Sequence, residues 1–96
     1  MKINEAIENA SEGIVWQVRF LTKEALEFVQ NSETGNSKEN RANDDNKSAK
    51  YLRLYDMFLG KYGWDKSELR KDRTPFGNLK HLLKKIDMEK LEKMAN

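Results

Sequence analysis

The chain contains no cysteine, a single histidine and a single proline among its 96 residues. Without cysteine it can form no disulfide bond and no thiolate metal site, which agrees with a reducing compartment. No apolar run approaches the roughly 18 residues that a membrane-spanning helix needs. The first residues are polar and lack the apolar core of a signal peptide. We therefore expect a cytoplasmic protein that does not contact a membrane.

Groups that carry catalytic chemistry are equally scarce. His81 is surrounded by lysines in the sequence and has no carboxylate at helical spacing, so it is a poor base or metal ligand. Asp44 and Asp45 lack the spacing and the glycine of a calcium loop. The chain has no glycine-rich phosphate loop and no nucleophile motif. The sequence predicts a non-enzymatic binding protein that uses no metal and no cofactor.

The apolar content is sufficient for one small folded domain spanning residues 1–96. Hydrophobic residues make up 38% of the chain, and four Phe, three Tyr and two Trp can anchor a core. A chain of this length forms one domain and buries only a small core.

The N-terminal half is predicted to be mainly helical. Apolar residues at helical spacing predict a short helix over residues 3–10, and residues 14–29 carry an apolar stripe about 100° wide. Residues 14–21 also alternate as a strand would, which is the α+β alternative. Helix is favoured because no second convincing strand is present to pair with this segment.

The middle of the chain is strongly polar. Residues 31–48 contain no aliphatic side chain larger than that of Ala42. Nothing in this stretch offsets the entropy lost when a chain becomes ordered. We expect residues 31–48 to form a long, mobile loop within the single domain.

Three further helices are expected after this loop. The first spans residues 48–60, with Ser48 as its N-cap. The second spans residues 65–72, where Asp65 and Glu68 have the spacing of a capping box.

The third spans residues 75–86, with Thr74 as the cap and Pro75 at the first helical position. After it the apolar pattern shifts to another face, which predicts a bend or break near Asp87.

These segments predict an all-α fold, a small bundle of four to five helices with a long flexible central loop. The predicted core consists of aliphatic and aromatic residues from three of the helices: Ile14, Val18, Leu21, Phe28, Leu52, Tyr55, Phe58, Leu59, Leu79, Leu83 and Ile86.

Charge is divided unevenly along the chain. Residues 1–46 carry five basic and nine acidic side chains, whereas residues 47–96 carry thirteen basic and seven acidic ones. Halves of opposite sign suggest either self-association into a homo-oligomer or a basic surface for an anionic partner.

The basic C-terminal region is the leading candidate for a binding surface. Three consecutive helices at 48–60, 65–72 and 75–86 suggest a unit like a helix-turn-helix, with the last as the reading helix. Lysine and arginine at this density attract phosphate backbones. The predicted function is binding of DNA or RNA through Lys66, Arg70, Lys71, Arg73, Asn78, Lys80, His81, Lys84 and Lys85.

The alternative is a regulator or inhibitor that binds a protein partner through exposed aromatic side chains. A helix over residues 14–29 would leave two of them, one turn apart, on the side away from the core. Two more aromatic side chains flank Gly63 in the sequence. A short, cysteine-free chain rich in Asn and Lys is also typical of small accessory proteins from phages and other mobile elements. The aromatic residues of this alternative are Trp16, Phe20, Tyr62 and Trp64.

Overall fold

A computed structural model describes residues 1–34 and 41–95, and this part of the chain is helical without a strand. The elements are α1 (Ile3–Asn9), α2 (Glu12–Thr34), α3 (Arg41–Leu59), the short 3₁₀ helix η2 (Gly60–Tyr62), α4 (Pro75–Lys85) and α5 (Met88–Met94). The predicted all-α bundle is confirmed. The strand alternative for residues 14–21 is wrong, because helical periodicity there buries Val15, Val18 and Leu21 on one face.

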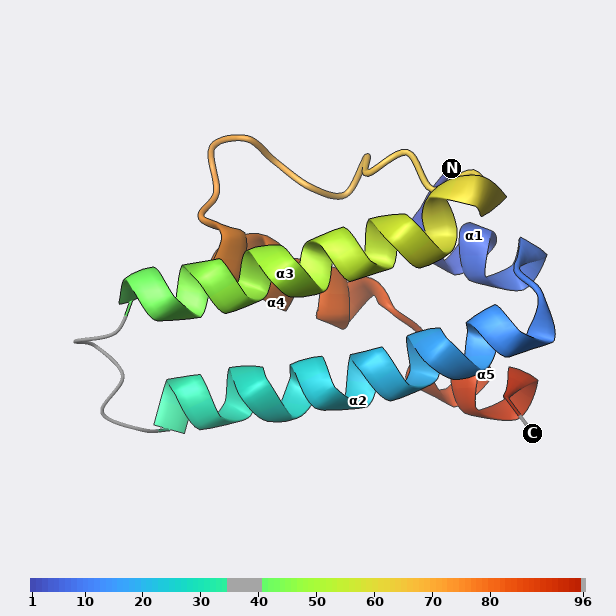
Figure 1. Cartoon of the computed structure of the whole chain (residues 1–96), viewed down its shortest axis with the longest axis horizontal. Coiled ribbons are helices and arrows are strands. Elements are labelled where there is room, and N and C mark those ends of the chain that lie inside the picture. The colour runs from blue at the N-terminus through green and yellow to red at the C-terminus, as the bar shows by residue number, and fades with distance from the viewer. Residues whose placement is uncertain (35–40, 96) are drawn as a thin grey trace.

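The two long helices form one layer, and the other helices pack on its far side. In Figure 1, α2 and α3 run side by side at the front, α4 lies behind them, and α1 and α5 lie at one end. Thr22 of α2 meets Tyr55 of α3, and Phe28 of α2 packs against Tyr51. Position numbers rise along one helix as they fall along the other, so α2 and α3 are antiparallel.

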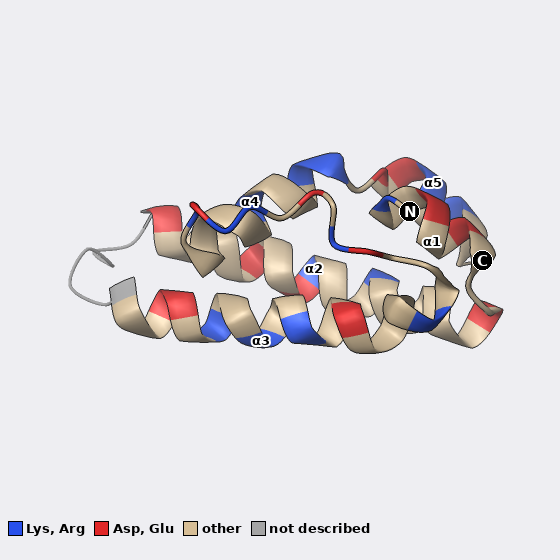
Figure 2. Ribbon diagram, turned by 90° about the horizontal axis from the view of Figure 1, so that it is seen from above, with Lys and Arg blue, Asp and Glu red and all other residues tan. Residues whose placement is uncertain are grey.

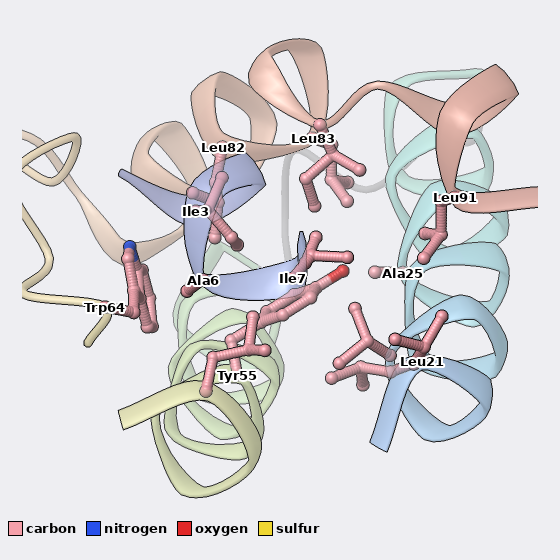
Figure 3. Close-up of a cluster of buried hydrophobic side chains, with 14 of the residues drawn as sticks. Ile3, Ala6, Ile7, Leu21, Ala25, Tyr55, Trp64, Leu82, Leu83 and Leu91 are labelled. Carbon is pink, nitrogen blue, oxygen red and sulfur yellow. The ribbon is translucent and has the colours of Figure 1, made fainter. Parts of the chain in front are cut away.

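The core lies between this layer and the helices behind it. Seven of the eleven predicted core residues are buried, whereas Ile14, Phe28, Leu52 and Phe58 are only half-buried at its edge. Figure 3 shows Ile3, Ala6 and Ile7 of α1 in the middle of the cluster, near Tyr55 and Leu82. The sequence prediction of the core omitted α1. It also omitted other buried residues, among them Trp64, Leu82 and Leu91.

The predicted loop over residues 31–48 is wrong at both of its ends. Residues 31–34 continue α2 and residues 41–48 begin α3, while residues 35–40 lie outside the described part of the chain. Ser48, expected to be an N-cap, is fully buried inside α3. The Asp45 carboxylate accepts a hydrogen bond from the backbone N–H of Phe76 at 3.2 Å. Contacts with α4 thus order polar residues whose own sequence does not favour helix.

The predicted helix over residues 65–72 is also wrong. Gly63 ends η2 with a φ of 98°, and Lys66 has a φ of 63°, a left-handed conformation that a right-handed helix cannot contain. Glu68 does not complete a capping box with Asp65. Its carboxylate instead accepts the backbone N–H of Ile3 at 2.9 Å. Long-range bonds to α1 therefore replace the expected local helix.

The end of the chain follows the sequence prediction. The Thr74 hydroxyl accepts the backbone N–H of Gly77 and caps α4, with Pro75 in its first turn. The helix stops at Lys85, and the Asp87 carboxylate caps α5 by accepting the N–H of Lys90 at 3.1 Å. Of the bend or break predicted near Asp87, the structure has the break, which separates α4 from α5.

Candidate binding surfaces

The extended segment before α4, residues 63–74, is attached to α4 by one side chain. The Asn78 amide donates to the carbonyl oxygen of Arg70 at 2.9 Å and accepts the N–H of the same residue at 3.0 Å. Asn78 is therefore buried and structural, and it does not belong to an exposed reading surface. The helix-turn-helix interpretation is wrong as well, because its middle helix is absent from this described segment.

A groove runs between this segment and α3. Its floor includes Ala49, Leu52, Leu69 and Pro75. Four of the predicted cations surround it: Lys66, Arg70, Lys71 and Arg73.

Two of these cations already have partners within the chain. Lys66 lies 3.3 Å from the Asp56 carboxylate, and Arg70 forms two bonds of 3.0 and 3.1 Å with Asp72. Lys71 and Arg73 have no carboxylate partner among the described residues.

A second group of predicted cations lies along the outer face of α4. Partial burial lowers the pKa of His81, and the nearby positive charges of Arg73, Lys85 and Lys84 lower it further. These four side chains therefore lie near one another. Lys80 lies one turn before Lys84 on α4 but is neutralised within the protein, because it pairs with Glu33 at 3.3 Å and lies over the Phe76 ring.

We use the name α4 cation cluster for Lys71, Arg73, Lys84 and Lys85. Lys84 and Lys85 are exposed, and neither has a carboxylate partner in the described part of the chain. Figure 2 shows basic residues along the segment before α4 and at the end of α4. His81 lies beside this cluster and is held mainly neutral at pH 7 by its lowered pKa.

The aromatic residues of the alternative surface separate into two groups. Trp16 and Phe20 are 47% and 64% exposed on the outer face of α2, and the Arg19 guanidinium lies over the Trp16 ring. Trp64 is only 4% exposed and packs edge-on against Tyr55, so it is a core residue and not part of a binding surface. Tyr62 is half-buried at the edge of the core.

The sequence prediction missed a row of exposed side chains on the outer face of α3 and η2. It consists of Lys50, Arg53, Met57 and Lys61, and Met57 is 68% exposed. None of its three cations has a carboxylate partner among the described residues. Their helical spacing is visible in the sequence.

Metal-binding side chains do not gather in the described part of the chain, where no three His, Asp or Glu residues could hold an ion together. None of the described helices is long and apolar enough to cross a membrane. Comparison with known proteins gives no relative. No family model, curated protein or solved structure matches this chain.

Proposed function

We propose that this protein binds nucleic acid through the α4 cation cluster and catalyses no reaction. The observation that carries the proposal is the set of four basic side chains, Lys71, Arg73, Lys84 and Lys85, that lack carboxylate partners among the described residues. Cations that are not neutralised within the protein can release counterions from a phosphate backbone when they bind it.

The proposed contacts are with phosphates and not with base edges. Asn78, the amide expected to read bases, is buried against the backbone of Arg70. Without a helix-turn-helix unit, no described helix has the arrangement that inserts a reading helix into a major groove. We therefore expect binding that depends on salt and depends little on sequence.

The test is fluorescence anisotropy of labelled duplex and single-stranded DNA and RNA, titrated with the protein at several salt concentrations. Four phosphate contacts predict a log–log slope of about −3.6 for duplex DNA and about −2.8 for single strands. The variant Lys84→Gln with Lys85→Gln should bind more weakly at low salt and lose about half of this slope.

The matched control is Lys2→Gln with Lys47→Gln, which removes the same charge from exposed positions outside the cluster. This control should keep the wild-type slope. Equal losses in the two double variants would mean that binding follows net charge alone, and they would reject this surface. A wild-type protein that binds none of the four probes at low salt would reject the function.

A further inference from the structure

The outer face of the α2–α3 layer carries two matching rows of exposed residues. The row on α2 consists of Trp16, Phe20, Glu24 and Glu27, at spacings of four, four and three. The row on α3 and η2 consists of Lys61, Met57, Arg53 and Lys50, at the same spacings in the opposite direction. Both spacings keep a row on one side of a helix. In Figure 1 the side of the α2–α3 layer opposite α4 points toward the viewer, and no described helix covers it.

The antiparallel register aligns the two rows position by position. The contact between Thr22 and Tyr55, 2.7 Å between their hydroxyl oxygens, fixes which residues of α2 and α3 lie at the same level. Two positions from this contact toward the start of α2, Phe20 is level with Met57. Two positions in the other direction, Glu24 is level with Arg53. The same count places Glu27 level with Lys50 and Trp16 level with Lys61.

Each level thus joins groups that attract each other. Two levels pair a carboxylate with a cation, one pairs an aromatic ring with Met57, and one pairs the Trp16 indole with a lysine. The carboxylates of Glu24 and Glu27 have no ion-pair partner among the described residues, and neither do Lys50 and Arg53. The complementary charges are therefore available to a second molecule.

We propose that this face binds a second copy of the same chain, in a dimer whose two-fold axis runs between α2 and α3 and parallel to them. This rotation lays α2 of one copy over α3 of the other at the same level. Glu24 then faces the partner's Arg53, Glu27 faces the partner's Lys50, and Phe20 faces the partner's Met57. Each pair occurs twice because the interface is isologous.

The other two-fold axis available in this plane is perpendicular to the helices and gives the wrong chemistry. It would place α2 over α2 and α3 over α3, with the order of each row reversed. Lys50 would then face the partner's Lys61, and Glu24 and Glu27 would face apolar side chains and not cations. Like charges across an interface are unfavourable. The pattern therefore selects one orientation of the two copies.

The face is also of suitable size and chemistry for a dimer. It is one of the two broad sides of a molecule measuring 39 × 27 × 17 Å. A standard interface covers about 800 Å² on each partner, which this side can supply. Three large apolar side chains exposed in the two rows, Trp16, Phe20 and Met57, provide the apolar contacts that such interfaces bury.

The test is sedimentation equilibrium of two charge-reversed variants, alone and mixed, with circular dichroism to verify their helical content. The variants are Glu24→Lys with Glu27→Lys, and Lys50→Glu with Arg53→Glu. The wild type should dimerise, and each variant alone should dimerise at least about tenfold more weakly, because both halves of its interface become repulsive. An equimolar mixture should restore the dimer, because every reversed row then faces a complementary one.

A matched control separates this pairing from attraction between net charges. Lys84→Glu with Lys85→Glu has the same net charge as Lys50→Glu with Arg53→Glu, but its changes lie in the α4 cation cluster. Alone it should dimerise like the wild type, and mixed with the Glu24→Lys, Glu27→Lys variant it should not restore a full-strength heterodimer. Equal restoration by both partners would overturn the proposal.

Two other results would also overturn the dimer. One is a wild-type protein that stays monomeric at millimolar concentration. The other is a mixture of the two charge-reversed variants that stays monomeric while both remain folded. If the wild type is monomeric and the Lys50→Glu, Arg53→Glu variant loses nucleic-acid binding, the α3 row belongs to a polyanion site instead. The dimer does not depend on the proposed nucleic-acid binding, because the two proposals place their contacts on different residues.

Discussion

At the scale of single residues, a buried polar contact joins Thr22 and Tyr55 across the α2–α3 layer. Thr22 and Tyr55 are both fully buried, and Thr22 Oγ1 donates to the carbonyl oxygen of Val18 at 2.7 Å. Its second contact, with the Tyr55 hydroxyl at 2.7 Å, therefore has Tyr55 as the donor. Burial raises the pKa of Tyr55, so the phenol stays neutral and keeps this proton.

This arrangement predicts an asymmetry between two conservative substitutions. Thr22→Val leaves the buried Tyr55 hydroxyl without an acceptor and should lower the free energy of unfolding by about 1–3 kcal/mol. Tyr55→Phe keeps the bond from Thr22 to Val18 and should cost only about 0.5–1.5 kcal/mol. Urea unfolding of both variants gives the comparison. A larger loss for Tyr55→Phe would contradict the assigned direction of the bond.

At the scale of elements, the segment between η2 and α4 has little regular secondary structure and is held mainly by long-range bonds. Asn78 binds both backbone groups of Arg70, and Glu68 accepts the N–H of Ile3. The backbone N–H of Asp65 donates to the carbonyl oxygen of Met1 at 3.2 Å. This segment carries part of the α4 cation cluster, so its attachment positions the proposed binding surface.

We predict that Asn78→Ala loosens this segment without disturbing the rest of the bundle. The variant loses two hydrogen bonds to Arg70, and the free energy of unfolding should fall by about 1–3 kcal/mol. Hydrogen exchange of the Arg70 amide should become faster. The exposed Asn46 offers a matched control, and Asn46→Ala should change neither quantity noticeably. Unchanged exchange at Arg70 in Asn78→Ala would show that other contacts hold the segment.

At the scale of the whole molecule, several titratable groups favour the fold only when they are deprotonated. Hydrogen bonds from Arg19 and Lys23 lower the pKa of Glu92 from its ordinary value of 4.5, and this carboxylate joins α5 to α2. Hydrogen bonds from the N-terminal amine and Ser67 lower the pKa of Asp65 to about 2. The pKa of His81 is also lowered from 6.5.

The direction of these shifts predicts that the protein is less stable in acid than at neutral pH. Where a folded pKa is lowered, the unfolded chain binds more protons, so stability rises with pH through that range. The contribution of Glu92 is therefore present above pH 4.5 and is lost as the pH falls through its folded pKa. His81 adds a loss that begins as the pH falls through about 6.5.

Urea unfolding at pH 7, 5 and 3 should show this loss for the wild type. Glu92→Gln should be less stable than the wild type at pH 7, and the difference should shrink toward pH 3 as Glu92 becomes protonated. A difference that stays constant over this range would contradict an electrostatic role for Glu92.

The sequence alone determined the elements whose signals are local. The apolar stripe of α2, the Thr74 cap of α4 and the break at Asp87 each depend on residues within a few positions of one another. These signals were sufficient to predict the all-α fold, seven of the buried core residues and the basic character of the α4 region.

Tertiary structure decided what depends on residues distant in the sequence. The first turns of α3 are polar but are ordered against α4, whereas residues 65–72 carry a helix signal that bonds to α1 override. Trp64 is buried because it packs against Tyr55 of α3 and beside Ala6 of α1 (Figure 3). Carboxylates from other elements neutralise Lys66 and Lys80, and the antiparallel register aligns the exposed rows of α2 and α3. This ordering, burial, ion pairing and register depend on which surfaces meet in three dimensions. The spacing of residues along the sequence carries no information about those contacts.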